Sequence, residues 1–190
     1  MLTSPYRKPY ITPPTDHPRL MLRKNDIPRI KENMSLPENA QAVEIIDELC
    51  SFSITGRGAT PEYGTYNLRE VLACEALSFK ALLIGDAESA KKAIDSLMLL
   101  LGSFKVLKGN MGARWGGHLI FTSAQVYDWC YDFLSPEQKK SIIGKLHSSS
   151  TISTACAFSG RNIFSFILGI SFFLSISLGC SFGGVIYGFL

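Results

Sequence analysis

The chain has 190 residues, a formal net charge of +3, and a composition of 46% hydrophobic and 18% charged residues. This length fits one ordinary domain or a portion of a larger protein. The small, scattered excess of positive charge excludes the strong basic patch expected of a nucleic-acid-binding protein. Residues 1–18 lack the apolar core of a signal peptide, so either the chain stays inside the cell or the recorded start is not the native one. The compartment is therefore left open.

The charged residues are distributed unevenly. Beyond Lys145 the only Lys, Arg, Asp or Glu is Arg161. Prolines recur through the first 18 residues and exclude a helix there. We therefore divide the chain into an extended Pro-rich arm (1–23), a normally charged domain (24–147) and an apolar tail rich in Ser, Gly and Phe (148–190).

The middle domain has a helical pattern throughout. Apolar residues recur at steps of three and four, and no segment has convincing strand alternation. We expect helices over residues 25–34, 35–53, 66–84, 87–101 and 118–134, and a further one from 136. The segments 54–64 and 105–117 are rich in glycine and are expected to be loops. In helix 118–134 the predicted buried stripe is Ile120, Ala124, Tyr127, Tyr131 and Leu134.

Two pairs of helices are joined by almost no loop. Gly85 is a typical C-cap, and Asp86 directly begins the following helix. Ser135 and Gln138 form an S-x-x-Q capping box around Pro136. Antiparallel hairpins of this kind, separated by longer loops, favour an all-α fold: part of an (α/α) toroid or a helical solenoid, followed by an apolar C-terminal helix.

Three segments in this order resemble one enzyme family. HPRLMLRKNDIPRIKEN (17–33), LSFKALLIGDAESAKKAIDSL (77–97) and GGHLIFTSAQVYDWCYDFLSPEQKKSII (116–143) are similar to the N-terminal toroid of heparinase II/III-type polysaccharide lyases. The resemblance covers residues 16–145. Members of that family have an (α/α) toroid followed by a β-sandwich, and they cleave uronate-containing polysaccharides by β-elimination. The resemblance thus implies an acidic polysaccharide as partner.

The chemistry of elimination is missing from this sequence. Elimination needs a base, an acid and a donor that neutralises the uronate carboxylate. In the family, a His with a Glu three positions later follows the segment matching 116–145. Here no His, Asp or Glu occurs beyond His147. We assign no catalytic residue and expect an inactive N-terminal fragment of such a lyase.

The candidate substrate-binding residues are Arg114, Trp115 and His118, in the predicted glycine-rich loop. An Arg can pair with a sugar carboxylate, and a Trp can stack on a pyranose face. The alternative is structural, with Trp115 packed on the hairpin, His118 capping a helix and Arg114 solvated.

Other candidate groups receive structural interpretations. Asp128 and Asp132 share a helix face, whereas a glycosidase pair brackets its substrate from opposing elements, so a solvated face is favoured. His17 is expected in a turn. The five cysteines have no zinc spacing, and those in helical patterns (Cys50, Cys74 and Cys130) are expected to be buried free thiols. No metal or cofactor is predicted.

Residues 163–190 contain no charge, and about 20 such residues span a bilayer. Either this is a transmembrane helix, or the tail is a frameshifted or mis-joined reading. The first possibility gives the alternative function, a membrane-anchored helical binding module without catalysis.

Overall fold

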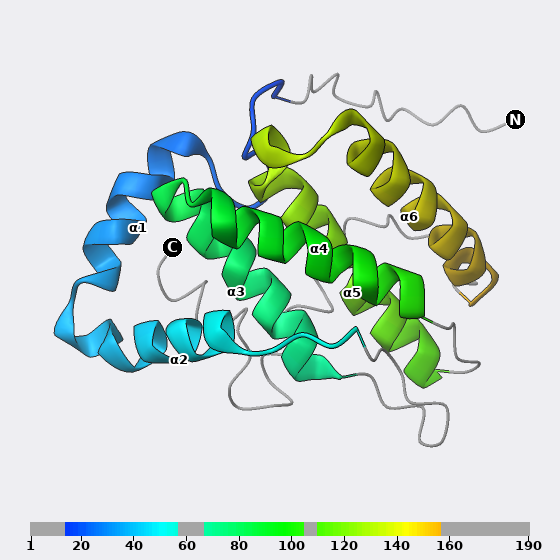
Figure 1. Cartoon of the computed structure of the whole chain (residues 1–190), viewed down its shortest axis with the longest axis horizontal. Helices are drawn as coiled ribbons and strands as arrows, with labels where there is room; N and C mark the ends of the chain where they lie inside the picture. Colours follow the sequence, from blue (N-terminus) through cyan, green and yellow to red (C-terminus); the bar gives the residue numbers. More distant parts are fainter. Residues whose placement is uncertain (1–13, 57–66, 105–109, 157–190) are drawn as a thin grey trace, which may run out of the picture.

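A computed structural model describes residues 14–56, 67–104 and 110–156, with the side chains of 110–115 and 147–156 left out. Over these ranges the chain is helical and contains no strand, which confirms the predicted all-α class (Figure 1). Three 3-10 turns and six α-helices follow one another: η1 (Lys24–Asp26), α1 (Ile27–Met34), η2 (Pro37–Asn39), α2 (Ala40–Ser51), α3 (Leu68–Ile84), α4 (Ala87–Ser103), α5 (Asn110–Trp129), η3 (Tyr131–Phe133) and α6 (Pro136–Cys156).

Helix α3 is the centre of the bundle. It packs against α2, α4 and α5 (Figure 1). Most of its side chains are buried. Two apolar clusters meet on it. One joins α3 to α4, α5 and α6 through residues such as Val71, Leu97, Val126 and Ile142. The other joins it to α1, α2 and the N-terminal segment through Leu22, Ile30, Ile46, Phe79 and Trp129.

The turn between α3 and α4 forms as predicted. Gly85 adopts the left-handed conformation (φ 69°, ψ 26°), which glycine enters without a Cβ penalty, and its N–H donates to the Ala81 carbonyl. The Asp86 carboxylate then accepts the N–H groups of Glu88 and Ser89. One helix therefore ends and the next begins within two residues, so α3 and α4 fold back on each other.

The capping box before α6 is also confirmed. The Gln138 N–H donates to Ser135 Oγ at 3.2 Å, and the Ser135 N–H donates to Gln138 Oε1 at 2.9 Å. The preceding helix ends earlier than predicted, because α5 stops at Trp129 and η3 leads into Ser135.

The predicted glycine-rich loop is wrong over residues 110–117, where α5 has already begun. Each glycine in a helix costs about 1 kcal/mol relative to alanine, but packing in the bundle outweighs this propensity. Gly117 is buried, and a Cβ at Gly116 would lie 3.7 Å from the Phe104 ring.

The predicted buried stripe of α5 is displaced around the helix. Of the predicted positions Leu134 is buried, but Ile120, Ala124, Tyr127 and Tyr131 are only half-buried. The buried positions instead include Leu119, Thr122, Ser123, Val126 and Cys130. Two of these are hydroxyl residues whose Oγ atoms lie within hydrogen-bond distance of the carbonyl four residues earlier. A hydrophobicity pattern does not count such residues as core, which explains the error.

Helix α2 begins later than expected. Ser35 does not cap it; instead its Oγ donates to the Glu32 carbonyl at the end of α1. The turn η2 follows, and α2 starts at Ala40.

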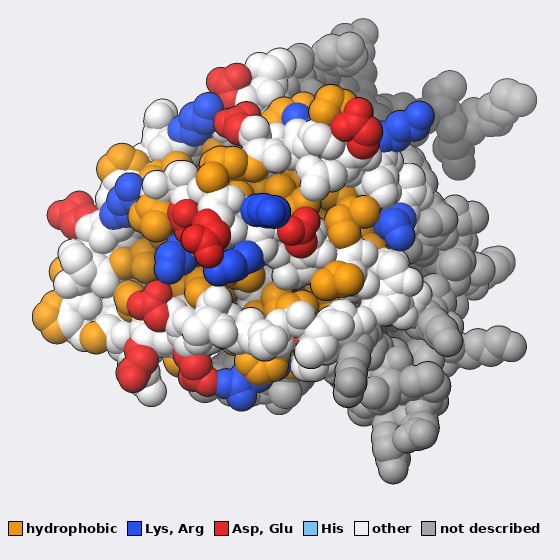
Figure 2. Space-filling view, viewed as in Figure 1, with side chains coloured by type: hydrophobic (Ala, Val, Ile, Leu, Met, Phe, Trp, Pro, Cys, Tyr) orange, Lys and Arg blue, Asp and Glu red, His pale blue; other side chains and the backbone are white. Residues whose placement is uncertain are grey.

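The predicted boundary between the helical domain and the tail, at 147/148, falls inside α6, whose backbone is helical to Cys156. Residues 163–190, with the predicted transmembrane segment, lie outside the described residues. Among the helices that the structure describes, none combines the length and apolarity needed to cross a bilayer. The face seen in Figure 2 carries positive and negative side chains interspersed with apolar ones.

Candidate functional site

A buried carboxylate joins the N-terminal segment to the end of α5. Asp128, 2% exposed, accepts the backbone N–H of Arg19 at 3.1 and 2.9 Å and that of Leu20 at 2.8 Å. His17 Nδ1 lies 2.6 Å from Asp128 Oδ1. Because a carboxylate that already receives two N–H groups acts as an acceptor, the proton of this third bond is on Nδ1. We call this set of contacts the Asp128 clasp.

Aromatic stacking extends the clasp to α6. The His17 ring lies parallel to that of Tyr131, with centroids 3.7 Å apart and an interplanar angle of 6°. Lys139 Nζ lies 3.6 Å from the centroid of the same tyrosine ring, a cation–π distance. Tyr127 meets the edge of His17 at a centroid distance of 6.5 Å. The N-terminal segment, η3 and α6 are thereby held together.

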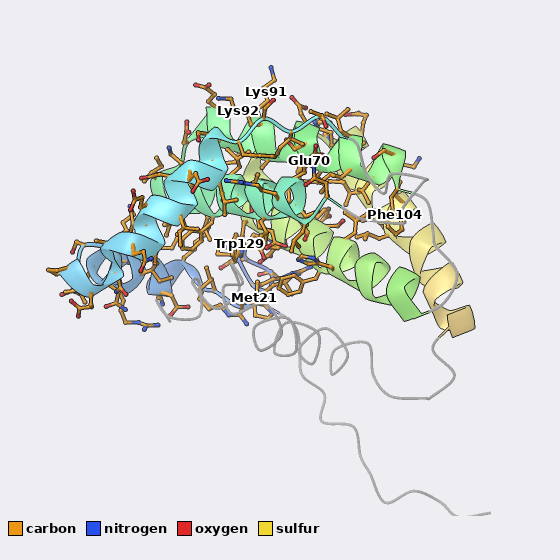
Figure 3. All side chains as sticks on the ribbon, turned by 90° about the horizontal axis from the view of Figure 1, so that it is seen from below. Met21, Glu70, Lys91, Lys92, Phe104 and Trp129 are labelled. Atoms are coloured by element: carbon orange, nitrogen blue, oxygen red, sulfur yellow. The ribbon has the colours of Figure 1, made fainter. Side chains whose placement is uncertain are left out.

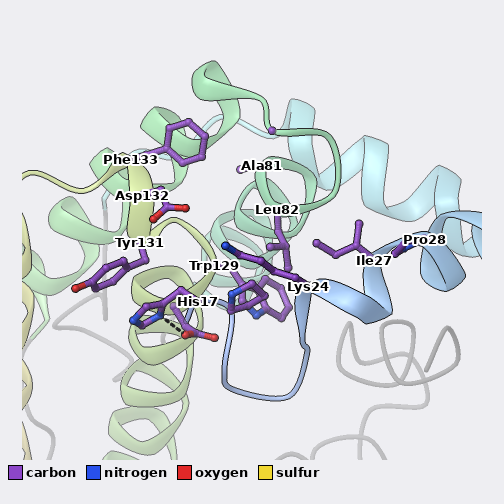
Figure 4. A pocket seen from close by; sticks show the side chains of 13 residues that line it. His17, Lys24, Ile27, Pro28, Ala81, Leu82, Trp129, Tyr131, Asp132 and Phe133 are labelled. Carbon is purple, nitrogen blue, oxygen red and sulfur yellow. Dashed lines mark hydrogen bonds and ion pairs between the residues drawn. The ribbon is translucent and has the colours of Figure 1, made fainter. Parts of the chain in front are cut away.

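A pocket of about 430 Å³ lies beside the clasp, between the N-terminal segment and the ends of α3 and α5 (Figure 4). Its walls are mainly apolar and include Ile27, Leu82 and Phe133. Lys24 and Asp132 line it from opposite elements, η1 and η3. Neither forms an ion pair within the described part of the chain. Such a cavity, apolar with a few polar groups, is of the size that binds small molecules.

A second polar cluster is buried between α3 and α5. His118 Nε2 lies 3.3 Å from Glu75 Oε1, and Thr122 Oγ1 also donates to that oxygen. Glu75 is 3% exposed and His118 is 8% exposed. A buried carboxylate is tolerated only when donors satisfy it, and these two residues of α5 supply them. The cluster therefore fixes the register between α3 and α5.

A third buried carboxylate, Glu70, holds the segment after α2. It accepts the N–H groups of Thr55 and Gly56, each at 3.1 Å, and the Thr55 hydroxyl at 2.5 Å. In Figure 3 Glu70 lies within the bundle, while Lys91 and Lys92 project outward from α4. Glu70 and Glu75 are both on α3: Glu70 contacts the segment after α2, and Glu75 contacts α5.

The three residues predicted to bind substrate fall in the first half of α5. Arg114 and Trp115 lie on its helical backbone, and their side chains are outside the described residues. His118 faces inward to Glu75, which is neither a helix cap nor an exposed loop position. Their role in substrate binding stays a prediction.

One structural interpretation from sequence is wrong and another is incomplete. Asp128 is not on a solvated face, because its carboxylate anchors the N-terminal segment. His17 lies where the chain bends, as predicted, but its ring also contacts Asp128. Asp132 is exposed, as predicted. Sequence reasoning also missed Glu75 and Lys24. The signal for the first was an acidic residue in the middle of a largely apolar helical run.

The cysteines that the structure describes with side chains are free thiols, as predicted. Burial raises the pKa of Cys130 to about 12, that of Cys50 to about 11 and that of Cys74 well above its ordinary value. These thiols are therefore protonated and unreactive near neutral pH. Among the described residues, no group of three or more His, Cys, Asp and Glu side chains could hold a metal ion.

Sequence comparison gives no match: no protein-family model matches the chain, and no curated protein is significantly similar to it.

Proposed function

We propose that this chain is the N-terminal helical portion of a heparinase II/III-like polysaccharide lyase, that it forms part of an (α/α) toroid, and that it binds an acidic polysaccharide without cleaving it. The observation that carries the proposal is the Asp128 clasp. It connects the first and third segments on which the family resemblance rests, His17–Asn33 and Gly116–Ile143. The second segment, Leu77–Leu97, forms the α3–α4 turn between them.

The arrangement of the helices supports the toroid. Two hairpins, α3–α4 and α5–α6, each close with a tight, capped turn, and α3 packs on α5 as well as on α4. Repeated hairpins that share neighbours in this way are the unit of α/α toroids.

The binding role is assigned to the first half of α5. Arg114 and Trp115 lie on the backbone of α5 about one turn before His118. Because His118 is 8% exposed and contacts Glu75, the proposal gives the carboxylate contact to Arg114 and the stacking contact to Trp115, and His118 helps to hold α5 against α3. An Arg matches a carboxylate with two parallel N–H donors, which a Lys does not offer.

The absence of cleavage is proposed from chemistry. Two histidines have side chains that the structure describes, His17 and His118, and each lies beside a buried carboxylate. His17 is further covered by Tyr131. A group that serves as base must reach the substrate proton, and these positions favour a structural role. An absorbance assay for unsaturated uronates on heparin, heparan, alginate and chondroitin tests this: turnover by the purified chain would refute it.

Binding is tested by affinity electrophoresis in gels containing each polysaccharide. We expect Arg114→Ala and Trp115→Ala to reduce the retardation of the chain. Lys91→Ala is the matched control, because Lys91 is an exposed cation on α4 and its loss changes the net charge equally. If Lys91→Ala reduces retardation as much as Arg114→Ala, the interaction is a nonspecific charge effect and the assignment to α5 fails.

A second candidate function rests on the 28 uncharged residues 163–190. They favour a membrane-anchored helical module that binds partners without chemistry of its own. Carbonate extraction of membranes distinguishes the two. A resistant membrane pool supports the anchored module, and its absence supports the first proposal.

A further inference from the structure

The pocket beside the Asp128 clasp is suited to bind a small molecule, whether or not the chain derives from a lyase. Its lining comes from segments far apart in the sequence: Lys24 and Ile27 near the N-terminus, Leu82 at the end of α3, and Trp129 and Asp132 after the middle of the chain (Figure 4). The Asp128 clasp fixes the first of these segments against the others. The pocket is therefore held in shape before any ligand arrives, which lowers the entropic cost of binding.

Besides the His17–Asp128 pair of the clasp, two side chains of opposite charge line the pocket, Lys24 and Asp132. Lys24 and Asp132 are both exposed at its rim, and their charged atoms are more than 4.0 Å apart because they form no ion pair. A ligand with one charge would be attracted to one of these groups and repelled by the other. A ligand carrying both an anionic and a cationic group complements both.

The other residues that line the pocket are mainly apolar and favour a ligand with an apolar group. Ile27, Leu82 and the 41%-exposed Phe133 offer apolar surface, and Tyr131 adds a second ring.

We infer that this pocket binds a free α-amino acid with a bulky apolar side chain. Its carboxylate pairs with Lys24, its ammonium group pairs with Asp132, and its side chain packs on Ile27, Leu82 and Phe133. Because both charged contacts are at the solvent-exposed rim, each contributes modestly and the affinity is weak, on the order of millimolar.

The test uses the full 190-residue chain and three probes in ligand-observed saturation-transfer NMR titrations. L-Phenylalanine carries both charges, phenethylamine only the cation and 3-phenylpropionate only the anion. We expect L-phenylalanine to bind roughly fivefold more tightly than either analogue. Equal affinities for all three probes, or no saturable binding of L-phenylalanine, would overturn the inference.

Two variants locate the site. Lys24→Met is expected to abolish the preference for L-phenylalanine over phenethylamine, because the carboxylate then has no cationic partner. Asp132→Asn is expected to abolish the preference over 3-phenylpropionate. Lys91→Met and Asp95→Asn, exposed charges on α4, are the matched controls and should keep both preferences. If the control variants behave like the pocket variants, the binding occurs elsewhere and the site is wrong. The result is independent of polysaccharide binding, so failure of either proposal leaves the other standing.

Discussion

Removal of the Asp128 carboxylate is the most informative perturbation of this fold. The carboxylate is 2% exposed and satisfies three donors: His17 Nδ1 and the N–H groups of Arg19 and Leu20. Hydrogen bonds to a charged group contribute about 1.5–3 kcal/mol each, but neighbouring contacts are not additive. Breaking a buried charged contact by removing one partner typically costs 3–5 kcal/mol. We therefore expect Asp128→Ala to lower the free energy of unfolding by about 3–5 kcal/mol, a large part of the 5–15 kcal/mol of a typical domain.

Urea denaturation measures the global effect, and hydrogen exchange of the Arg19 and Leu20 amides measures the local one. Asp132→Ala is the control, since Asp132 is an exposed carboxylate four residues away and its removal should change stability by less than about 0.5 kcal/mol. A His17→Ala/Asp128→Ala double-mutant cycle should give a coupling energy of about 1 kcal/mol or more. The clasp would be refuted if Asp128→Ala matched Asp132→Ala in urea and left both amides as protected as in the wild type.

Three further predictions address the rest of the bundle. Gly85→Ala should destabilise the chain by about 1 kcal/mol, because the φ angle of Gly85 is +69°. Gly102→Ala, in an exposed part of α4, should instead stabilise it by about 0.5–1 kcal/mol. Equal urea midpoints for the two variants would contradict the turn geometry. Glu75→Gln should cost about 1–3 kcal/mol by weakening the bonds from His118 and Thr122, and an unchanged midpoint would argue against the buried cluster. The Cys130 thiol ionises near pH 9 when unfolded but at about 12 when folded, so its contribution to stability is complete below pH 9 and is lost as pH rises from 9 to 12. Cys130→Ala should therefore lose less stability than the wild type between pH 8 and pH 10, and parallel curves would contradict the buried thiol.

The parts of the fold that depend on local chemistry could be predicted from the sequence. Gly85 and Asp86 specify a turn whatever surrounds them, since one permits a positive φ and the other satisfies helix N–H groups. The Ser135 capping box is local in the same sense. By contrast, the start of α5 depends on packing against α3 and Phe104, which a local pattern does not contain.

The candidate site could not be predicted because its contacts are long-range. His17 and Asp128 are 111 residues apart, and nothing in either local sequence indicates the other. The Glu75–Thr122 contact spans 47 residues. A hydrophobicity pattern assigns a polar residue in an apolar helix to the surface, because it contains no information on a distant partner. The pocket could not be predicted for the same reason, because Lys24 and Asp132 are far apart in the sequence and line one pocket only in the folded chain.

The central claim, that this helical unit binds acidic polysaccharide without cleaving it, is tested most directly by one experiment. The chain is run through gels containing heparin, alginate, chondroitin or a neutral polysaccharide, and the same gels are then analysed for unsaturated uronates. We predict retardation in at least one acidic gel, none in the neutral gel, and no unsaturated product. Equal mobility in all gels, or unsaturated product in any of them, would contradict the account.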